Sequence, residues 1–142
     1  MLVSQLLKSK GEAVFTALPH ETLQGAATML HARRVGAMVV MDGGEVVGIL
    51  SERDVVRAVS EQGSAALSRP ISEVMSREVI FAEPKESLDL LLERMTDRRI
   101  RHLPVCQDGR LVGIVSIGDL VKAKIAETEA EARTLKAYIA AG

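Results

Sequence analysis

The sequence contains two copies of one pattern. When the chain of 142 residues is shifted by 65 positions, its halves align without a gap and carry the same residue at 18 positions. Common apolar residues alone do not explain the match, because prolines, glycines, serines and aspartates also recur at turn and cap positions. These are Pro19 and Pro84, Gly48 and Gly113, Ser51 and Ser116, and Asp54 and Asp119. The repeat predicts that one structural unit was duplicated.

Each copy predicts the element order β-α-β-β-α. In the first copy we expect a brief strand over 13–16 and a helix that Thr22 caps and that ends near Val35. Apolar runs at 37–41 and 46–50 flank a Gly-rich turn, which predicts a hairpin. Ser51 then caps a helix over 52–59, whose first turn carries acidic residues that complement the helix dipole.

The second copy and the flanking segments follow the same reasoning. We expect a strand over 79–81, a helix from Ser87 to Asp97, a hairpin of 102–106 and 111–116, and a last helix capped by Ser116. Short helices are expected over 2–8 and 71–75. The segment 125–142 predicts a charged helix with a narrow apolar stripe, which packs on the body or on a second subunit.

These elements predict an α/β (α+β) chain of two β-α-β-β-α repeats packed about a pseudo-twofold axis, with additional N- and C-terminal helices. One repeat alone leaves an apolar sheet face uncovered, so two must pack together. The predicted boundaries are 1–65 for repeat 1 with the N-terminal helix, 66–124 for repeat 2, and 125–142 for the C-terminal helix. Equivalent loops of the two units then form related clefts, which are candidate binding sites.

Composition excludes several classes of function. Eighteen basic and 19 acidic residues give a net charge of −1, and aromatic residues make up 2%, so nucleic acid is an improbable partner. The single cysteine and the absence of a Cys/His cluster argue against a disulfide or a metal site and favour a cytoplasmic setting. The sequence shows neither an apolar run long enough to cross a membrane nor a catalytic motif.

The segments Gly48–Asp54 (GILSERD) and Gly113–Asp119 (GIVSIGD) contain the candidate ligand-binding residues. Glycine allows close approach to a ligand, Ser sits at a helix N-terminus, and Asp lies one turn later on the same face. Helix N-termini favour phosphate and a carboxylate suits ribose hydroxyls, so the pattern predicts a ribose phosphate ligand. Alternatively, Ser51 and Ser116 are plain N-caps and the aspartates plain first-turn charges.

These two segments, the β-α-β-β-α order and the RHLPV stretch at 101–105 resemble a tandem pair of cystathionine-β-synthase (CBS) domains, a Bateman module, over about residues 7–124. The resemblance implies a stand-alone regulatory module without catalysis or a catalytic cofactor. It would bind AMP, ADP or ATP, and also NAD(H), and signal occupancy to an effector protein that the sequence does not identify. It also implies a homodimer formed through helices beside the clefts, with Val55, Val56, Leu120 and Val121 in the contact.

In the family, each cleft combines two strands of one repeat with the Ser and Asp of the other. The first site then uses Gly11, Val14, Val35, Gly36, Ala37 and Met38 with Ile114, Ser116 and Asp119. The second site uses Ser76, Arg77, Val79, Ile100, Arg101, His102, Leu103 and Pro104 with Ile49, Ser51, Arg53 and Asp54.

The two predicted sites differ in charge. Gly36 and Ala37 of the first site stand where the second has Arg101 and His102, so we expect the first site to gain room and lose charge. This asymmetry predicts unequal ligands, with NAD in the roomier cleft and AMP or ADP in the basic one. Alternatively, Arg98, Arg99 and Arg101 form a solvated helix end.

Two other classes of function remain open. A structural dimeric interaction protein with unoccupied clefts would dimerise regardless of nucleotide. An enzyme acting on a nucleotide is disfavoured, because neither cleft offers a base paired with a nucleophile. Among the remaining residues, Cys106 and the methionines are expected in the core, although Met38 could also flank a base. The residues do not separate S-adenosylmethionine from the other adenosine ligands.

Overall fold

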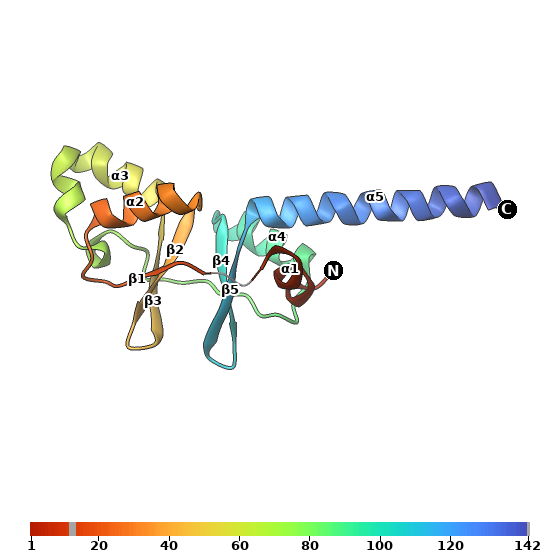
Figure 1. Cartoon of the computed structure of the whole chain (residues 1–142), viewed down its shortest axis with the longest axis horizontal. Helices are drawn as coiled ribbons and strands as arrows, with labels where there is room; N and C mark the ends of the chain where they lie inside the picture. Colours follow the sequence, from red (N-terminus) through yellow and green to blue (C-terminus); the bar gives the residue numbers. More distant parts are fainter. Residues whose placement is uncertain (12–13, 142) are drawn as a thin grey trace.

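A computed structural model describes residues 1–11 and 14–141 (Figure 1). Repeat 1 contains β1 (Thr16–Ala17), α2 (Leu23–Arg33), β2 (Ala37–Asp42), β3 (Glu45–Ser51) and α3 (Glu52–Gln62). Repeat 2 contains α4 (Leu88–Arg98), β4 (His102–Gln107), β5 (Arg110–Ser116) and α5 (Ile117–Ala141). The helix α1 (Val3–Lys10) precedes them, and the 3-10 helices η1 (Gly63–Ser68) and η2 (Ile71–Glu73) connect them. The mixed α+β class and the duplicated unit are therefore confirmed.

Local sequence explains the helix starts and hairpin turns. Thr22 accepts a hydrogen bond from the Gly25 N–H, and Ser87 from the Leu90 N–H, as expected for N-caps. The β2–β3 turn places Gly43 and Gly44 at φ of 59° and 84°. In the β4–β5 turn Asp108 adopts a φ of 52° before Gly109. Positive φ at both central residues is typical of tight hairpins and suits Gly, Asn and Asp.

The repeats differ in their first strand. In repeat 1, β1 pairs in parallel with β2, and the Val39 N–H donates to the Phe15 carbonyl. The prediction of a strand over 79–81 is wrong: repeat 2 has an isolated bridge between Ala82 and Val105. The equivalent of Val39 is Pro104, which has no N–H to donate, so the ladder cannot extend the same way. In repeat 1 the predicted strand is also shifted, to Thr16–Ala17, and residue 13 lies outside the described residues.

Each repeat completes its core with a segment that lies next to the other repeat in sequence. Leu6 and Leu7 of α1 pack into the core of repeat 2, whereas Ile71 and Met75 after η1 pack into that of repeat 1. Glycines on β3 and β5 make these contacts possible. A Cβ built at Gly113 would lie 2.7 Å from Cδ2 of Leu7, and one at Gly48 would clash with Met75. The proposed boundary at 65/66 therefore separates segments that share a core.

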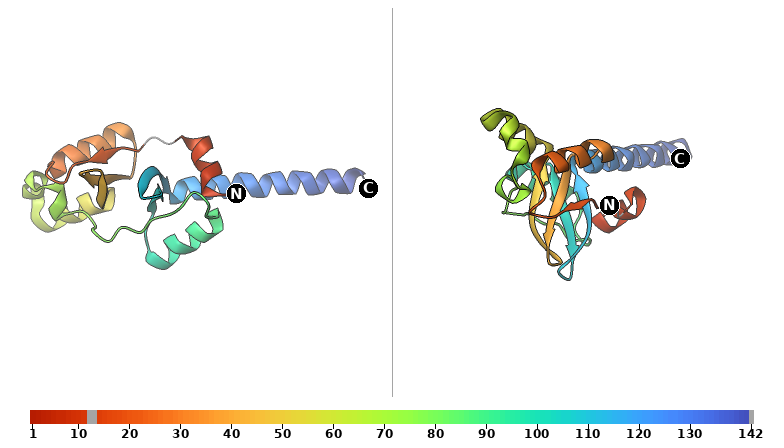
Figure 2. Two further views of the ribbon diagram at one scale, coloured as in Figure 1. Left: turned by 90° about the horizontal axis from the view of Figure 1, so that it is seen from below. Right: turned by 60° about the vertical axis from the view of Figure 1, so that its left-hand side comes forward.

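The last helix is continuous. The last helix of repeat 2 and the C-terminal helix form one element, α5, of 25 residues. With a rise of about 1.5 Å per residue, it is about 37 Å long. Both orientations in Figure 2 show its outer half extending beyond the body. Leu120 is its buried residue, so this predicted dimer-contact residue belongs instead to the core of repeat 2.

Candidate functional site

A cavity of about 400 Å³ lies between the repeats and coincides with the predicted second site. Repeat 1 contributes the end of β3 and the start of α3, and repeat 2 contributes the segment before α4 and the start of β4. The predicted residues on its wall are Ile49, Ser51, Arg53, Asp54, Ser76, Val79, Ile100, Arg101, His102 and Pro104. This size is within the range of small-molecule sites. Main-chain hydrogen bonds of 3.0 Å in both directions between Ile49 and Ser76 tie the two repeats together at this wall.

The wall from repeat 1 is built around a reciprocal cap at the start of α3. The Asp54 N–H donates to Ser51 Oγ (3.3 Å), and the Ser51 N–H donates back to Asp54 Oδ2 (2.8 Å). Oδ1 accepts one hydrogen bond from Arg57, at 2.9 Å. A carboxylate oxygen has two lone pairs, so Oδ1 retains capacity for a ligand hydroxyl. Ser51 and Asp54 thus cap α3 and also present polar groups to the cavity. The interpretation of the motif as a plain N-cap is therefore compatible with its interpretation as a ligand-binding motif.

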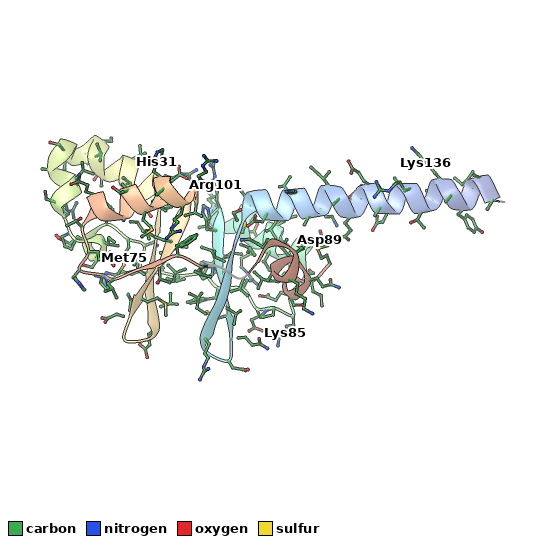
Figure 3. The ribbon with its side chains drawn as sticks, viewed as in Figure 1. His31, Met75, Lys85, Asp89, Arg101 and Lys136 are labelled. Atoms are coloured by element: carbon green, nitrogen blue, oxygen red, sulfur yellow. The ribbon has the colours of Figure 1, made fainter. Side chains whose placement is uncertain are left out.

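Arginines give the cavity its basic character. Arg53 and Arg57 come from α3, Arg99 follows α4, and Arg101 precedes β4. Arg99 has a left-handed φ of 56°, at the C-cap of α4. Figure 3 shows Arg101 at the junction of the repeats. Guanidinium groups from both repeats can therefore approach one anion, with Glu52, Asp54 and Glu78 as the acidic residues on the wall.

Apolar side chains line the rest of the cavity. Ile49, Val79, Ile80 and Ile100 all lie on its wall and are partly buried. They provide a surface on which a flat aromatic ring can pack. An apolar wall beside a basic one is the arrangement that a nucleotide requires.

His102 connects the two predicted sites. A Cβ built at Gly36 would lie 2.9 Å from Nε2 of His102 and 3.2 Å from Oε1 of Glu52. The extra room that we expected beside Gly36 is therefore occupied by the imidazole, and this prediction is wrong. Burial lowers the pKa of His102, and the nearby Arg101 and Lys10 charges lower it further, whereas Asp119 and Glu52 raise it. The net lowering favours a neutral imidazole.

The predicted first site is occupied by a side chain of α1. Lys10 Nζ lies 2.9 Å from Asp119 Oδ2 and donates to the Ile114 carbonyl at 2.6 Å. Asp119 and Ser116 form the same reciprocal cap as in repeat 1, with Asp119 N–H to Ser116 Oγ at 3.1 Å. Burial raises the pKa of Asp119, but hydrogen bonds from Lys10 and Ser116 outweigh it, so the pKa is lowered overall.

Several predicted residues do not reach an open cleft. Ala37, Met38 and Leu103 are buried, with Met38 in the core of repeat 1 and Leu103 in that of repeat 2. Arg77 donates to the Ser72 carbonyl (3.1 Å) and is not on the cavity wall. Gly11 is exposed and Val14 is partly buried. Val35 lines a different cavity, between α2 and α3, and Gly36 of the predicted first site lies on the wall of the second-site cavity. Both faces of β2 and β4 are covered near the starts of these strands, because the residues from Ala37 to Val40 and from Leu103 to Val105 are buried without interruption.

Three basic residues at the two sites were not predicted from the sequence: Lys10, Arg57 and Arg99. Arg57 lies one turn after Asp54, and Arg99 repeats Arg34, so helical spacing and the duplication itself were usable signals. Lys10 has no such signal, because its partner Asp119 is 109 positions away and meets it through the packing of α1 on repeat 2.

Within residues 1–11 and 14–141, no helix is both long and apolar enough to cross a membrane. The same residues contain no group of His, Cys, Asp and Glu arranged to hold a metal ion.

Comparison with known proteins identifies the class of this fold and site. The CBS domain family matches the chain twice, over residues 8–61 and 71–126, and the chain belongs to this family as a CBS pair. It is 35% identical to the mitochondrial CBS domain-containing protein CBSX3 of Arabidopsis thaliana, covering 99% of this chain and 72% of that protein.

Solved CBS-pair structures agree with the fold. The CBS-domain containing protein ATU1752 of Agrobacterium tumefaciens superimposes with a TM-score of 0.85 at 46% identity, covering 87% of this chain and 92% of that one. The CBS domain pair of MJ0100, solved with 5′-methylthioadenosine and S-adenosyl-L-methionine, gives a TM-score of 0.80 at 27% identity, covering 89% and 98%.

Proposed function

We propose that this chain is a regulatory module that binds an adenine nucleotide in the cavity between the repeats and signals its occupancy to a partner protein, without catalysis of its own. The observation that carries the proposal is the pairing, on one cavity wall, of the Ser51–Asp54 cap with Arg101 from the other repeat. The adenosine compounds bound by the MJ0100 pair support an adenosine ligand.

Each part of the wall has a role in this proposal. The apolar side chains of Ile49, Val79, Ile80 and Ile100 contact the base, and Asp54 Oδ1 accepts from a ribose hydroxyl. Arg53 and Arg101 bind the phosphate, where charge-assisted hydrogen bonds are the strong ones. AMP and ADP are the preferred ligands, because the cavity of about 400 Å³ suits a mononucleotide better than both halves of NAD.

The module binds one nucleotide per chain in this proposal, because Lys10 engages the carboxylate and the Ile114 carbonyl at the first site. Val56 and Val121 are 67% and 44% exposed on α3 and α5, which supports a homodimer formed through these helices. The effector would read a ligand-dependent difference between two states of this dimer.

A binding panel tests the proposal. AMP, ADP, ATP, NAD, NADH, GMP and S-adenosylmethionine are added to the wild type and to the S51A/D54A and S116A/D119A variants, and the melting temperature is measured. Ligand at a hundredfold its Kd adds about 2.7 kcal/mol to folded-state stability, a shift of several degrees. We expect AMP or ADP to raise the melting temperature of the wild type and S116A/D119A but not of S51A/D54A. No shift with any compound would support a structural interaction protein with unoccupied clefts.

A further inference from the structure

Among the residues that the structure describes, none packs against the outer half of α5. Every residue from 128 to 141 is exposed, including Leu135 at 59%, Tyr138 at 77% and Ile139 at 67%. Figure 3 shows Lys136 far from the body on this extension. A single helix of this length is only marginally stable in water, so exposed Leu and Ile side chains along one face favour a second helix.

Spacing along α5 defines the face. Apolar or small residues recur at alternating intervals of four and three, the period of 3.5 that is typical of two-stranded coiled coils. This α5 seam consists of Val121, Ile125, Thr128, Ala132, Leu135 and Ile139. Ile125 and Ile139 then take heptad position a, and Leu135 takes position d, the combination that favours two parallel strands.

Charges beside the seam select the parallel orientation. In a parallel pair the residue at g meets the residue at e five positions later in the second helix. On α5 this places Lys124 opposite Glu129 of the second copy and Glu131 opposite Lys136 of the second copy, so both pairs attract. Lys124 also contacts Asp89 of α4 at 3.0 Å, which leaves Glu131 and Lys136 as the clearer pair to test.

The antiparallel arrangement reverses this result. Aligning the same seam antiparallel, with Thr128 opposite Ala132, brings g beside g and e beside e. Glu129 then faces Glu129 of the second copy, Glu131 faces Glu131, and Lys122 faces Lys136. Like charges at these positions are destabilising.

We propose that residues 121–139 of α5 form a parallel two-stranded coiled coil with the same segment of a second copy of this chain. Thr128 and Ala132 have small side chains that bury little surface in the seam. The coil therefore acts together with the proposed dimer contact through α3 and α5 rather than alone. The proposal concerns α5 and is independent of nucleotide binding. It fixes how the two bodies are arranged, because parallel helices place both CBS pairs at the same end of the coil.

Disulfide trapping tests the orientation. In a C106S background, L135C is oxidised with glutathione and the covalent dimer is quantified by non-reducing electrophoresis. A parallel coil places the two thiols introduced at position 135 in the same layer, so we expect L135C to cross-link. A137C, on the outer face of the same turn, is the matched control and should cross-link much less. Residue 135 is exposed, so the body of the variant stays folded, which a thermal melt verifies.

Three outcomes would overturn the proposal. One is no cross-link with L135C, and another is equal cross-linking by L135C and A137C, which indicates random collision. The third is a cross-link that forms only when I125C and L135C chains are mixed, which indicates an antiparallel pair.

Charge reversal provides an independent readout. In the L135C background, E131K and K136E should each slow disulfide formation several-fold, because each creates like-charge pairs in a parallel coil. Mixing E131K chains with K136E chains should restore the rate through mixed dimers. An antiparallel coil predicts instead that K136E speeds cross-linking between I125C and L135C chains, because it removes the repulsion between Lys122 and Lys136.

Discussion

Lys10 and Asp119 form an ion pair of 2.9 Å across the predicted first site, between the N-terminal helix and the repeat farthest from it in sequence. The same ammonium group binds the Ile114 carbonyl. The equivalent position in the second site has instead the main-chain hydrogen bonds between Ile49 and Ser76, so the cavity beside the Ser51–Asp54 cap stays open. One duplicated motif thus occupies two different environments.

Replacing Lys10 should open the first site. K10M removes the cation from Asp119, and we expect calorimetry to detect a second, weaker AMP site beside the single site of the wild type. The cost in stability should be small, about 0.2–1 kcal/mol, because the pair is partly exposed. K8M on the same helix changes the same charge but leaves the Lys10–Asp119 pair in place, so it should keep one site. Two equal sites in the wild type would contradict this role of Lys10.

Arg101 should discriminate between nucleotide and nucleoside. A hydrogen bond to a charged group contributes about 1.5–3 kcal/mol, so R101A should weaken AMP binding by about ten- to hundredfold. Adenosine lacks the phosphate, and its affinity should change little. R110A, at the start of β5 and outside the cavity wall, serves as the control. Equal losses for AMP and adenosine, measured by calorimetry, would place Arg101 elsewhere than at the phosphate.

Gly48 should tolerate no side chain. A Cβ there would clash with Met75 and lie 2.9 Å from the Ser76 carbonyl oxygen, which belongs to the backbone and cannot rotate away. We expect G48A to cost about 1–3 kcal/mol in urea denaturation, the usual cost of overpacking. G25A in α2 is the contrasting variant, since its Cβ meets only Thr22 Oγ1, at 3.4 Å. It should be neutral or stabilising because Ala is the better helix former. A stable G48A protein would show that Met75 and Ser76 can move away from β3.

His102 should make stability depend on pH. Its pKa is lowered in the folded protein, whereas the unfolded chain has an ordinary value of about 6.5. The unfolded state therefore binds more protons below that pH, so the His102 contribution is complete above about 6.5 and is lost as the pH falls towards the folded pKa.

Urea midpoints near pH 7.5 and pH 5.5 provide the measurement, within the range where an ordinary histidine titrates. H102Q should lose less stability across this interval than the wild type does, whereas H31Q, on the exposed end of α2, should lose as much. Identical losses for the wild type and H102Q would mean that protonated His102 is accommodated by Asp119 and Glu52.

Prediction from sequence succeeded where the determinants are local. The hairpins and the caps at Thr22, Ser51, Ser87 and Ser116 depend on short motifs and their duplication. The expectation that most second-site residues share one cavity came instead from the resemblance to CBS pairs. It failed where distant segments meet. The imidazole beside Gly36 and the ion pair of Lys10 depend on how the repeats pack, and the lost strand before α4 depends on the missing N–H of Pro104.

The crossed packing of α1 and η2 means that the unit of duplication is not the unit of folding. A chain cut between residues 65 and 66 would leave the first fragment without Ile71 and Met75 and the second without Leu6 and Leu7. Each fragment would carry the apolar residues that complete the core of the other fragment. We therefore expect neither fragment to fold alone and the two fragments to fold together when they are mixed.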